Sequence, residues 1–216
     1  IPGGSGHRLV KESRTASVSV TKTRQGVGLQ AEVELELIRK CTTGDPRFFE
    51  PLVRAYEGPG LRVATGMLGD TDEARDALQE AFVKVFKNLP RFDKKRAFGP
   101  WFFQILRNQC RDMIRARNSR GARETRDERL EFRPADAEKG PERVRQRSAA
   151  KELLWRGLDA IGEDHREIIV LKELQGFRYP EIAEILDIPE GTVASRLYHA
   201  RRALKSALED LGVQYP

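Results

Sequence analysis

The most informative segment of the chain spans residues 176–202 and reads GFRYPEIAEILDIPEGTVASRLYHARR. Its apolar side chains recur at the spacing of a helix face, first in Ile182, Ala183 and Leu186 and then, after a break at Pro189, in Val193, Leu197 and Ala200, and Leu204 continues this face just beyond the segment. Two short amphipathic helices that meet at such a break can pack their apolar faces together. The sequence therefore predicts a helix-turn-helix over these residues.

The other face of the second predicted helix is polar and basic. No acidic residue lies between Thr192 and Ser206, and the face carries Ser195, Tyr198, His199 and Arg202, flanked by Arg196, Arg201 and Lys205. Hydroxyl, imidazole and guanidinium groups can reach base edges in a major groove while flanking cations meet phosphates. The alternative is that the two helices form an ordinary hairpin of a protein core. The basic face of the second helix would then contact only water, since basic amphipathic helices are common.

Composition favours an anionic partner. The formal net charge is +6 and the isoelectric point is near 9.5. No apolar run approaches the roughly 18 residues of a membrane-spanning helix, and the first residues lack the apolar core of a secretory signal, so we expect a cytoplasmic protein without membrane insertion. Cys41 and Cys110 have no Cys or His neighbour at metal-ligand spacing, so no disulfide, metal or other cofactor is expected.

The chain is expected to be all-α, with two small helical domains, because no pattern of alternating β-branched residues persists in it. Residues 1–30 read as a disordered extension or a tail added for expression, because they are rich in Gly, Ser and Thr without an apolar period. The first domain is expected over residues 31–118 and the second over residues 149–212. Residues 119–148 mix charges of both signs with Pro and Gly, which predicts a flexible linker.

Several helix boundaries can be predicted in the first domain. Its first helix is expected to turn one apolar face inward, made of Val33, Leu37, Ile38 and Cys41. The sequence Gly58-Pro59-Gly60 predicts an interruption of the next helix. Asp70 with Glu73 three residues later resembles a capping box, and the helix that it opens should end at Pro90.

Residues 91–117 form a basic, aromatic segment, with eight cations against two acids. A helix is expected from Trp101 to about Asn118. On it, Arg107, Arg111 and Arg115 recur every four residues, so they should form one ridge that can follow a phosphate backbone. Phe98 and Trp101 lie beside this ridge, and aromatic rings suit unstacked bases. Packing in the core is the alternative for Trp101.

These segments occur in an order that resembles bacterial RNA polymerase sigma factors of the extracytoplasmic function group, which have two domains. DALQEAFVKVF at residues 76–86 resembles the family's helix for the polymerase clamp. FGPWFFQILRN at residues 98–108 resembles its −10 recognition loop and helix, and residues 181–197 resemble its −35 reader. The resemblance covers about Ala31 to Leu211 and rests on the co-occurrence of these segments in order.

The resemblance implies an alternative sigma factor that binds core RNA polymerase, reads −35 and −10 promoter elements, and melts the −10 region without nucleotide hydrolysis. It implies core-polymerase contacts by Asp76, Gln79, Glu80 and Lys84. It implies −10 contacts to single-stranded non-template DNA, with Phe98 capturing a flipped base, by Lys94, Arg96, Phe98, Trp101, Arg107, Asn108, Arg111 and Arg115. It implies −35 contacts to duplex DNA by Thr192, Ser195, Arg196, Tyr198, His199 and Arg202. An anti-sigma factor is a further implied partner.

Two other classes of protein compete with this interpretation. A repressor or a response-regulator output protein would share the helix-turn-helix and act without polymerase, but it would leave the basic, aromatic segment over residues 91–117 without a purpose. An enzyme acting on nucleic acid would need a catalytic set of residues. The sequence has no acidic cluster with metal-ligand spacing, no Walker-type phosphate loop and no Ser/His/Asp grouping, so an enzyme is not expected.

Overall fold

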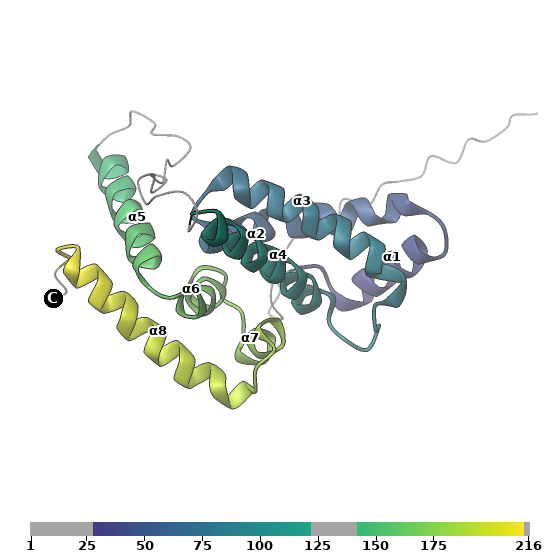
Figure 1. Ribbon diagram of the computed structural model, residues 1–216. Helices are drawn as coiled ribbons and strands as arrows, with labels where there is room; N and C mark the ends of the chain where they lie inside the picture. The colour runs from purple at the N-terminus through teal and green to yellow at the C-terminus, as the bar shows by residue number, and fades with distance from the viewer. Residues whose placement is uncertain (1–27, 122–141, 214–216) are drawn as a thin grey trace, which may run out of the picture.

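The computed structural model describes residues 28–121 and 142–213, and every regular element within these two ranges is a helix (Figure 1). The prediction of an all-α fold is confirmed. The predicted extension lies almost entirely outside the described residues, as does most of the predicted linker. The last residues of that linker, from Glu142 onward, instead form the first turns of a helix.

Four α-helices make up the first helical unit: α1 (Ala31–Thr42), α2 (Glu50–Leu68), α3 (Thr71–Asn88) and α4 (Phe98–Gly121). Short 3-10 turns, η1 (Pro46–Phe49) and η2 (Leu89–Arg91), precede α2 and follow α3. The side chain of Asp70 accepts hydrogen bonds from the backbone N–H groups of Asp72 and Glu73, each 2.8 Å long, so the predicted N-terminal cap of α3 is confirmed.

The predicted interruption at Gly58-Pro59-Gly60 is wrong, because α2 runs through all three residues. A proline in a helix interior costs about 3 kcal/mol, so tertiary packing must offset it. A Cβ atom at Gly60 would lie 2.7 Å from Leu78 Cδ1 and 3.3 Å from Phe102 Cζ. The glycine therefore lets α2 approach α3 and α4 closely, and this packing holds both halves of α2 on one core.

Helix α1 is rotated relative to the predicted inward face. Ile38 is fully buried as expected, but Val33 is 37% exposed and Glu34 is buried in its place. The carboxylate of Glu34 accepts hydrogen bonds from the Tyr56 hydroxyl and from the Leu29 backbone N–H, the latter at 3.1 Å. Because these two hydrogen bonds satisfy the buried side chain of Glu34, this polar group is tolerated inside the first helical unit.

The second helical unit comprises α5 (Glu142–Ala160), α6 (Glu163–Ile169), a π-helical turn η3 (Val170–Leu174), α7 (Tyr179–Leu186) and α8 (Glu190–Asp210). Helices α7 and α8 form the predicted helix-turn-helix, with Asp187 between them in the left-handed region at φ 54°. The predicted apolar stripe is confirmed, since Val193, Leu197 and Ala200 are buried on α8.

The two helical units pack directly against each other. Helices α6 and α7 lie between α4 and α8 (Figure 1). The rings of Phe103 on α4 and Phe177 before α7 meet edge to face with centroids 4.8 Å apart, and the buried side chains of both units form one continuous cluster. Two domains joined only by a linker would not share a core, so this contact is a feature that the sequence did not indicate.

Candidate nucleic-acid interface

One face of α8 gathers the polar side chains that the sequence predicted for −35 contacts. Ser195, Tyr198, His199 and Arg202 are all exposed, and Tyr198 exposes 57% of its surface. The Tyr198 ring meets the His199 ring edge to face with centroids 5.4 Å apart, and the Arg202 guanidinium lies 5.8 Å from the Tyr198 centroid. Thr192 is half-buried at the start of the same helix. These side chains therefore form one surface on the side of α8 opposite its apolar stripe.

Two arginines flank this surface differently. Arg196 is half-buried on α8. Arg201 donates two hydrogen bonds to Glu173 Oε1, of 3.0 Å from Nε and 2.6 Å from Nη2, and both of these side chains are largely exposed. Arg201 is thus already paired with an acid of η3, whereas Arg202 points away from the core beside Tyr198.

The side chains predicted for −10 contacts do not form a single open surface. In the loop before α4, Lys94 is exposed, but Arg96 is paired with Glu184 of α7 at 2.8 Å. At the other end of the set, Arg115 is exposed and pairs with Asp112 of its own helix at 3.2 Å. Asn108 is also exposed and accepts a hydrogen bond from Arg107.

The middle of the predicted arginine ridge is covered by α6. Arg107 donates to both carboxylate oxygens of Glu167, with distances of 2.9 Å from Nε and 3.0 Å from Nη2. Arg111 reaches Glu167 at 3.4 Å and Asp164 at 3.1 Å. Side-chain exposure is 12% for Arg107 and only 1% for Glu167. The ridge exists on α4 as predicted, but two of its three arginines are held by acids of the second unit.

The expectation that Phe98 captures a flipped base from a loop does not fit its position. Phe98 begins α4, ahead of the predicted start at Trp101, and exposes only 2% of its surface. Its ring packs 5.2 Å from Tyr56 and 5.9 Å from Phe92, centroid to centroid. Trp101 is half-buried and lies on Phe92 at 4.6 Å. Burial of a large ring stabilises the core, so Phe98 is a packing residue here and Trp101 is the aromatic side chain that reaches the surface.

All side chains predicted to contact polymerase lie exposed along α3: Asp76, Gln79, Glu80 and Lys84. Lys84 also donates a hydrogen bond to Gln109 of α4. The structure brings these four residues onto one side of the helix, as the apolar stripe of α3 predicted.

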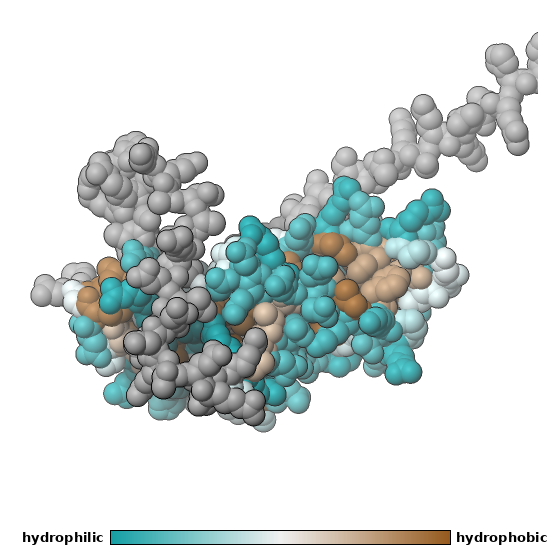
Figure 2. Space-filling view, turned by 45° about the horizontal axis from the view of Figure 1, so that its top comes forward, coloured by the Kyte–Doolittle hydropathy of each residue, from teal (hydrophilic) through white to brown (hydrophobic). Residues whose placement is uncertain are grey.

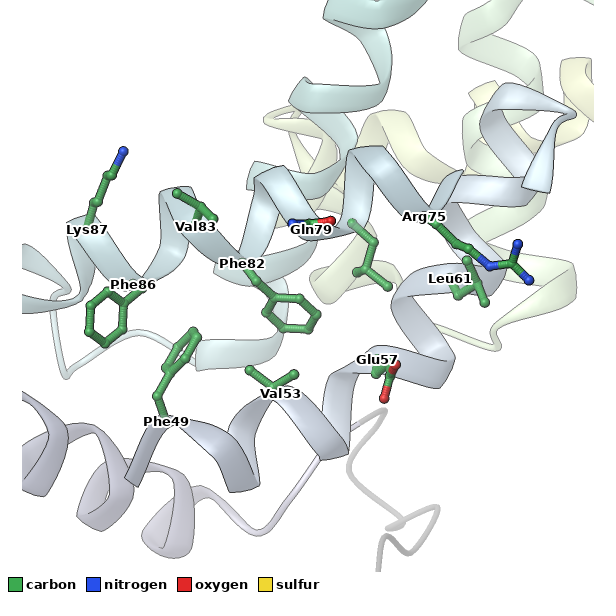
Figure 3. Close-up of a pocket in the computed structure, with 11 residues that line it drawn as sticks. Phe49, Val53, Glu57, Leu61, Arg75, Gln79, Phe82, Val83, Phe86 and Lys87 are labelled. Carbon is green, nitrogen blue, oxygen red and sulfur yellow. The ribbon is translucent and has the colours of Figure 1, made fainter. Parts of the chain in front are cut away.

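An apolar groove of about 670 Å³ lies beside this polar face, between α2 and α3 (Figure 3). Phe49 and Val53 face Phe82 and Phe86 across it, and Gln79 lies at its edge. Figure 2 shows apolar residues gathered on this side of the molecule among hydrophilic ones. Sequence reasoning missed the groove, although Val83 and Phe86, at 39% and 43% exposure, lie off the buried stripe of α3 and could have signalled it.

Within residues 28–121 and 142–213, no group of three or more His, Cys, Asp or Glu side chains is placed to hold a metal ion. No helix of this part of the chain is long and apolar enough to cross a membrane. Burial raises the pKa of the Cys110 thiol to about 12, so this thiol is protonated at neutral pH and unsuited to nucleophilic chemistry.

Comparisons with known proteins agree with the geometry. The model of Sigma-70 region 2 matches residues 52–120, and that of Sigma-70 region 4 matches residues 151–204. The RNA polymerase sigma-H factor of Pseudomonas aeruginosa is 31% identical over 188 residues, covering 85% of this chain and 97% of that protein. The ECF RNA polymerase sigma-E factor of Escherichia coli K12 is 31% identical over 180 residues, covering 81% of this chain and 94% of that protein.

Solved structures give the same result. The structure of CnrH in complex with the cytosolic domain of CnrY has a TM-score of 0.61 and 26% identity, covering 82% of this chain and 98% of that one. The sigma factor RpoE of Bartonella quintana, solved with the anti-sigma factor NepR, has a TM-score of 0.55 and 26% identity, covering 70% of this chain and 91% of that one. With both sigma regions in order and relatives that align over almost their whole length, the chain belongs to the extracytoplasmic function group of RNA polymerase sigma factors: it is a non-enzymatic, alternative initiation factor that directs RNA polymerase to promoters.

Proposed function

We propose that this sigma factor has two domains, residues 31–118 and residues 149–212, and that each domain binds a different element of the promoter. The observation that carries the proposal for the second domain is the exposed face of α8, where Ser195, Tyr198, His199 and Arg202 lie together. A helix of this width fits a major groove, and these side chains can donate to or accept from base edges of a −35 element. Arg196 and Thr192 at the border of the face suit the phosphates on either side.

The first domain would bind the −10 element through α4 and the loop before it. Lys94, Arg96, Arg107, Arg111 and Arg115 would meet phosphates of the single-stranded non-template strand, with Asn108 beside them. Trp101 reaches the surface and lies on Phe92, so it offers a ring on which an unstacked base can rest. Phe98 would support this platform from below rather than contact the base. Melting would then be driven by binding, without nucleotide hydrolysis.

The exposed side of α3 would bind core RNA polymerase. Asp76 and Glu80 supply negative charge, while Gln79 and Lys84 add polar groups that suit the coiled-coil clamp of the enzyme. The adjacent groove contributes apolar area from Val83 and Phe86. A contact with an apolar centre and a charged border is the usual composition of a protein interface.

We further propose that the protein works in the cytoplasm, where core polymerase and promoter DNA are found, and that an anti-sigma factor holds it inactive. Support comes from two similar chains, since CnrH was solved with the cytosolic domain of CnrY and RpoE of Bartonella quintana with NepR.

The assignment of α3 can be tested with charge reversal. Replacing Asp76 and Glu80 together by Lys should weaken association with core polymerase and abolish run-off transcription, because both side chains lie exposed on the proposed contact face. Glu32→Lys with Glu152→Lys is a matched control, since it changes the net charge equally at exposed positions on α1 and α5. Core binding that is equal for the two double variants would refute the assignment.

A further inference from the structure

We propose that His199 makes the choice of −35 sequence depend on pH, because its imidazole reads a base edge and protonation changes which base it prefers. This inference rests on the proposed −35 function of α8. Of the six side chains proposed for that contact, His199 is the one of a type that ordinarily changes charge between pH 5 and 8. The other five are hydroxyl, phenol and guanidinium groups, which ordinarily keep their charge in this range.

His199 lies on the solvent side of α8, where a DNA groove can reach its ring. The residue is exposed, whereas the nearby Leu197 and Ala200 are buried. Its ring meets that of Tyr198 edge to face with centroids 5.4 Å apart, and the Arg202 guanidinium lies 5.8 Å from the Tyr198 centroid. Tyr198 therefore contacts both the titratable ring and a permanent cation, and all three side chains belong to one surface.

The charged side chains closest to His199 along α8 are cations. Arg196 precedes it by three residues and Arg202 follows it by three, so both lie about one turn away. Glu173 of η3 reaches α8, but its carboxylate accepts from Arg201 at 2.6 Å. The side chains around the imidazole thus include no carboxylate that is left to pair with it on this part of the described surface.

The helices packed against α8 carry acids as well, but these acids have other partners. Helices α5, α6 and α7 meet α8 on its buried side, marked by Val193 and Leu197. Among the described residues, ion pairs of these helices and of α8 itself join Asp159 to Arg166, Asp164 to Arg111, Glu167 to Arg107, Glu181 to Arg178, Glu184 to Arg96 and Glu209 to Lys205. None of these pairs includes His199. Bound DNA, rather than the protein, would supply the negative charge that favours a protonated imidazole.

Protonation changes what an imidazole can recognise. The neutral ring has one N–H donor and one nitrogen acceptor, whereas the cation has two N–H donors and no acceptor. In the major groove, guanine presents only acceptors, N7 and O6, while adenine and cytosine each present an amino donor. Protonated His199 therefore suits guanine, and only the neutral ring can accept from adenine or cytosine. As the pH falls, the preferred base at one −35 position should shift toward guanine, with the proton taken up from solvent.

Two substitutions of His199 separate the effect of charge from that of titration. His199→Gln stays neutral and His199→Arg stays charged, while the wild type titrates. Each is reconstituted with core polymerase, and the probe is a fluorescent duplex that contains a −35 element selected by the wild-type holoenzyme at pH 6, without a −10 element. Affinities are expressed relative to His199→Gln at pH 6, 7 and 8, so that any pH response of the polymerase itself cancels.

The wild type should gain affinity over His199→Gln as the pH falls, by at most about tenfold per pH unit, the limit for uptake of one proton. The ratio of His199→Arg to His199→Gln should stay constant. His165→Gln is the matched control, since it removes the histidine of α6, outside the reading face, and should keep the wild-type response.

Selection from a −35 library at pH 6 and at pH 8 tests the base preference. The wild type should enrich guanine at one position by about fivefold or more at the lower pH, and His199→Gln should select the same sequence at both. A ratio of wild type to His199→Gln that is constant with pH overturns the proposal. So does a pH-dependent affinity without a change of base, which would place the imidazole on a phosphate. Failure of the proposed −35 function would look different, because Arg202→Ala and His199→Arg would then leave −35 binding unchanged at every pH.

Discussion

Glu34 is a carboxylic acid enclosed between α1 and α2, with 6% of its surface exposed. Burial raises its pKa above the ordinary value, although hydrogen bonds from Tyr56 and from the Leu29 backbone oppose the shift. The folded chain therefore holds this proton more tightly than the unfolded chain does. The resulting contribution to stability is fully present below the ordinary pKa of the group and is lost as the pH rises through the raised pKa of the folded state.

We expect Glu34→Gln to remove this pH dependence. The amide oxygen can still accept from Tyr56 and Leu29, but the side chain no longer titrates. Urea unfolding midpoints of wild type and variant, measured from about pH 4 to about pH 8, should differ by an amount that changes across this range. The variant should gain stability relative to the wild type toward the neutral end. A constant difference would show that burial does not perturb this carboxyl group.

At the same scale, Phe98 shows where sequence reasoning about single residues fails. A phenylalanine beside cations in a basic segment fits both a base-stacking role and a core role, and nothing in the sequence separates them. The structure places it among Tyr56, Phe92 and Phe102, because α4 begins with this residue. For a similar reason Val33 is exposed where burial was expected, and Glu34 is buried instead. One turn of helix has too few apolar residues to fix the rotation of the helix about its axis.

Among the elements, α8 combines a buried stripe with an outer face on which neighbouring arginines have different surroundings. Arg201 is paired with Glu173, while Arg202 lies over the Tyr198 ring. Arg202→Ala should therefore change which −35 sequence is preferred, at a cost of roughly 1–3 kcal/mol for its best base pair if a two-pronged base contact is lost. Selection from a library of −35 sequences, with transcription by the reconstituted polymerase as readout, measures this preference.

Arg201→Ala is the matched control on the same helix, because it removes the same charge beside the reading face. It should leave the order of preferred sequences unchanged. If Arg202→Ala instead weakens all −35 sequences equally, Arg202 binds phosphate and does not read bases.

Elements built from short-range patterns were the ones that the sequence predicted well. The helix-turn-helix of α7 and α8 follows from apolar spacing within about twenty-five residues, and the cap at Asp70 follows from its neighbours. The continuity of α2 was missed because Pro59 disfavours a helix locally. In the folded chain Gly60 packs closely against Leu78 of α3 and Phe102 of α4, which are distant in the sequence. Tertiary contacts thus overrule local propensity where they are dense.

Over the whole molecule, the shared core predicts that both helical units unfold together. The protein has two tryptophans, Trp101 in the first unit and Trp155 in the second, so Trp155→Phe and Trp101→Phe variants each report on one unit. Their fluorescence transitions in urea should coincide, because the buried cluster spans both units. A Cβ atom at Gly66 of α2 would lie 2.7 Å from Val170 of η3, across the contact between the units, so introducing Gly66→Ala into both variants should separate the two transitions. Transitions that already differ without this substitution would show that the units are energetically independent.

The packing of the two helical units against each other could not be predicted from the sequence, for a physical reason. Arg107 and Glu167 are separated by 60 residues, and each alone reads as an ordinary charged residue on an amphipathic helix. Their pairing depends on how two preformed units fit together, with Val170 meeting Gly66 as one point of contact. Periodicity and motifs describe each unit separately and carry no information about that fit.

The pairing of Arg107 and Arg111 with Glu167 also affects where copies without polymerase reside in a cell. A bacterial chromosome is a vast polyanion that offers on the order of 10⁶ or more competing sites, and each exposed cation adds to the affinity for all of them. In the structure, two cations of the most basic segment are paired with the buried carboxylate of Glu167. We therefore expect fewer copies to be held by bulk DNA and more to diffuse freely to core polymerase.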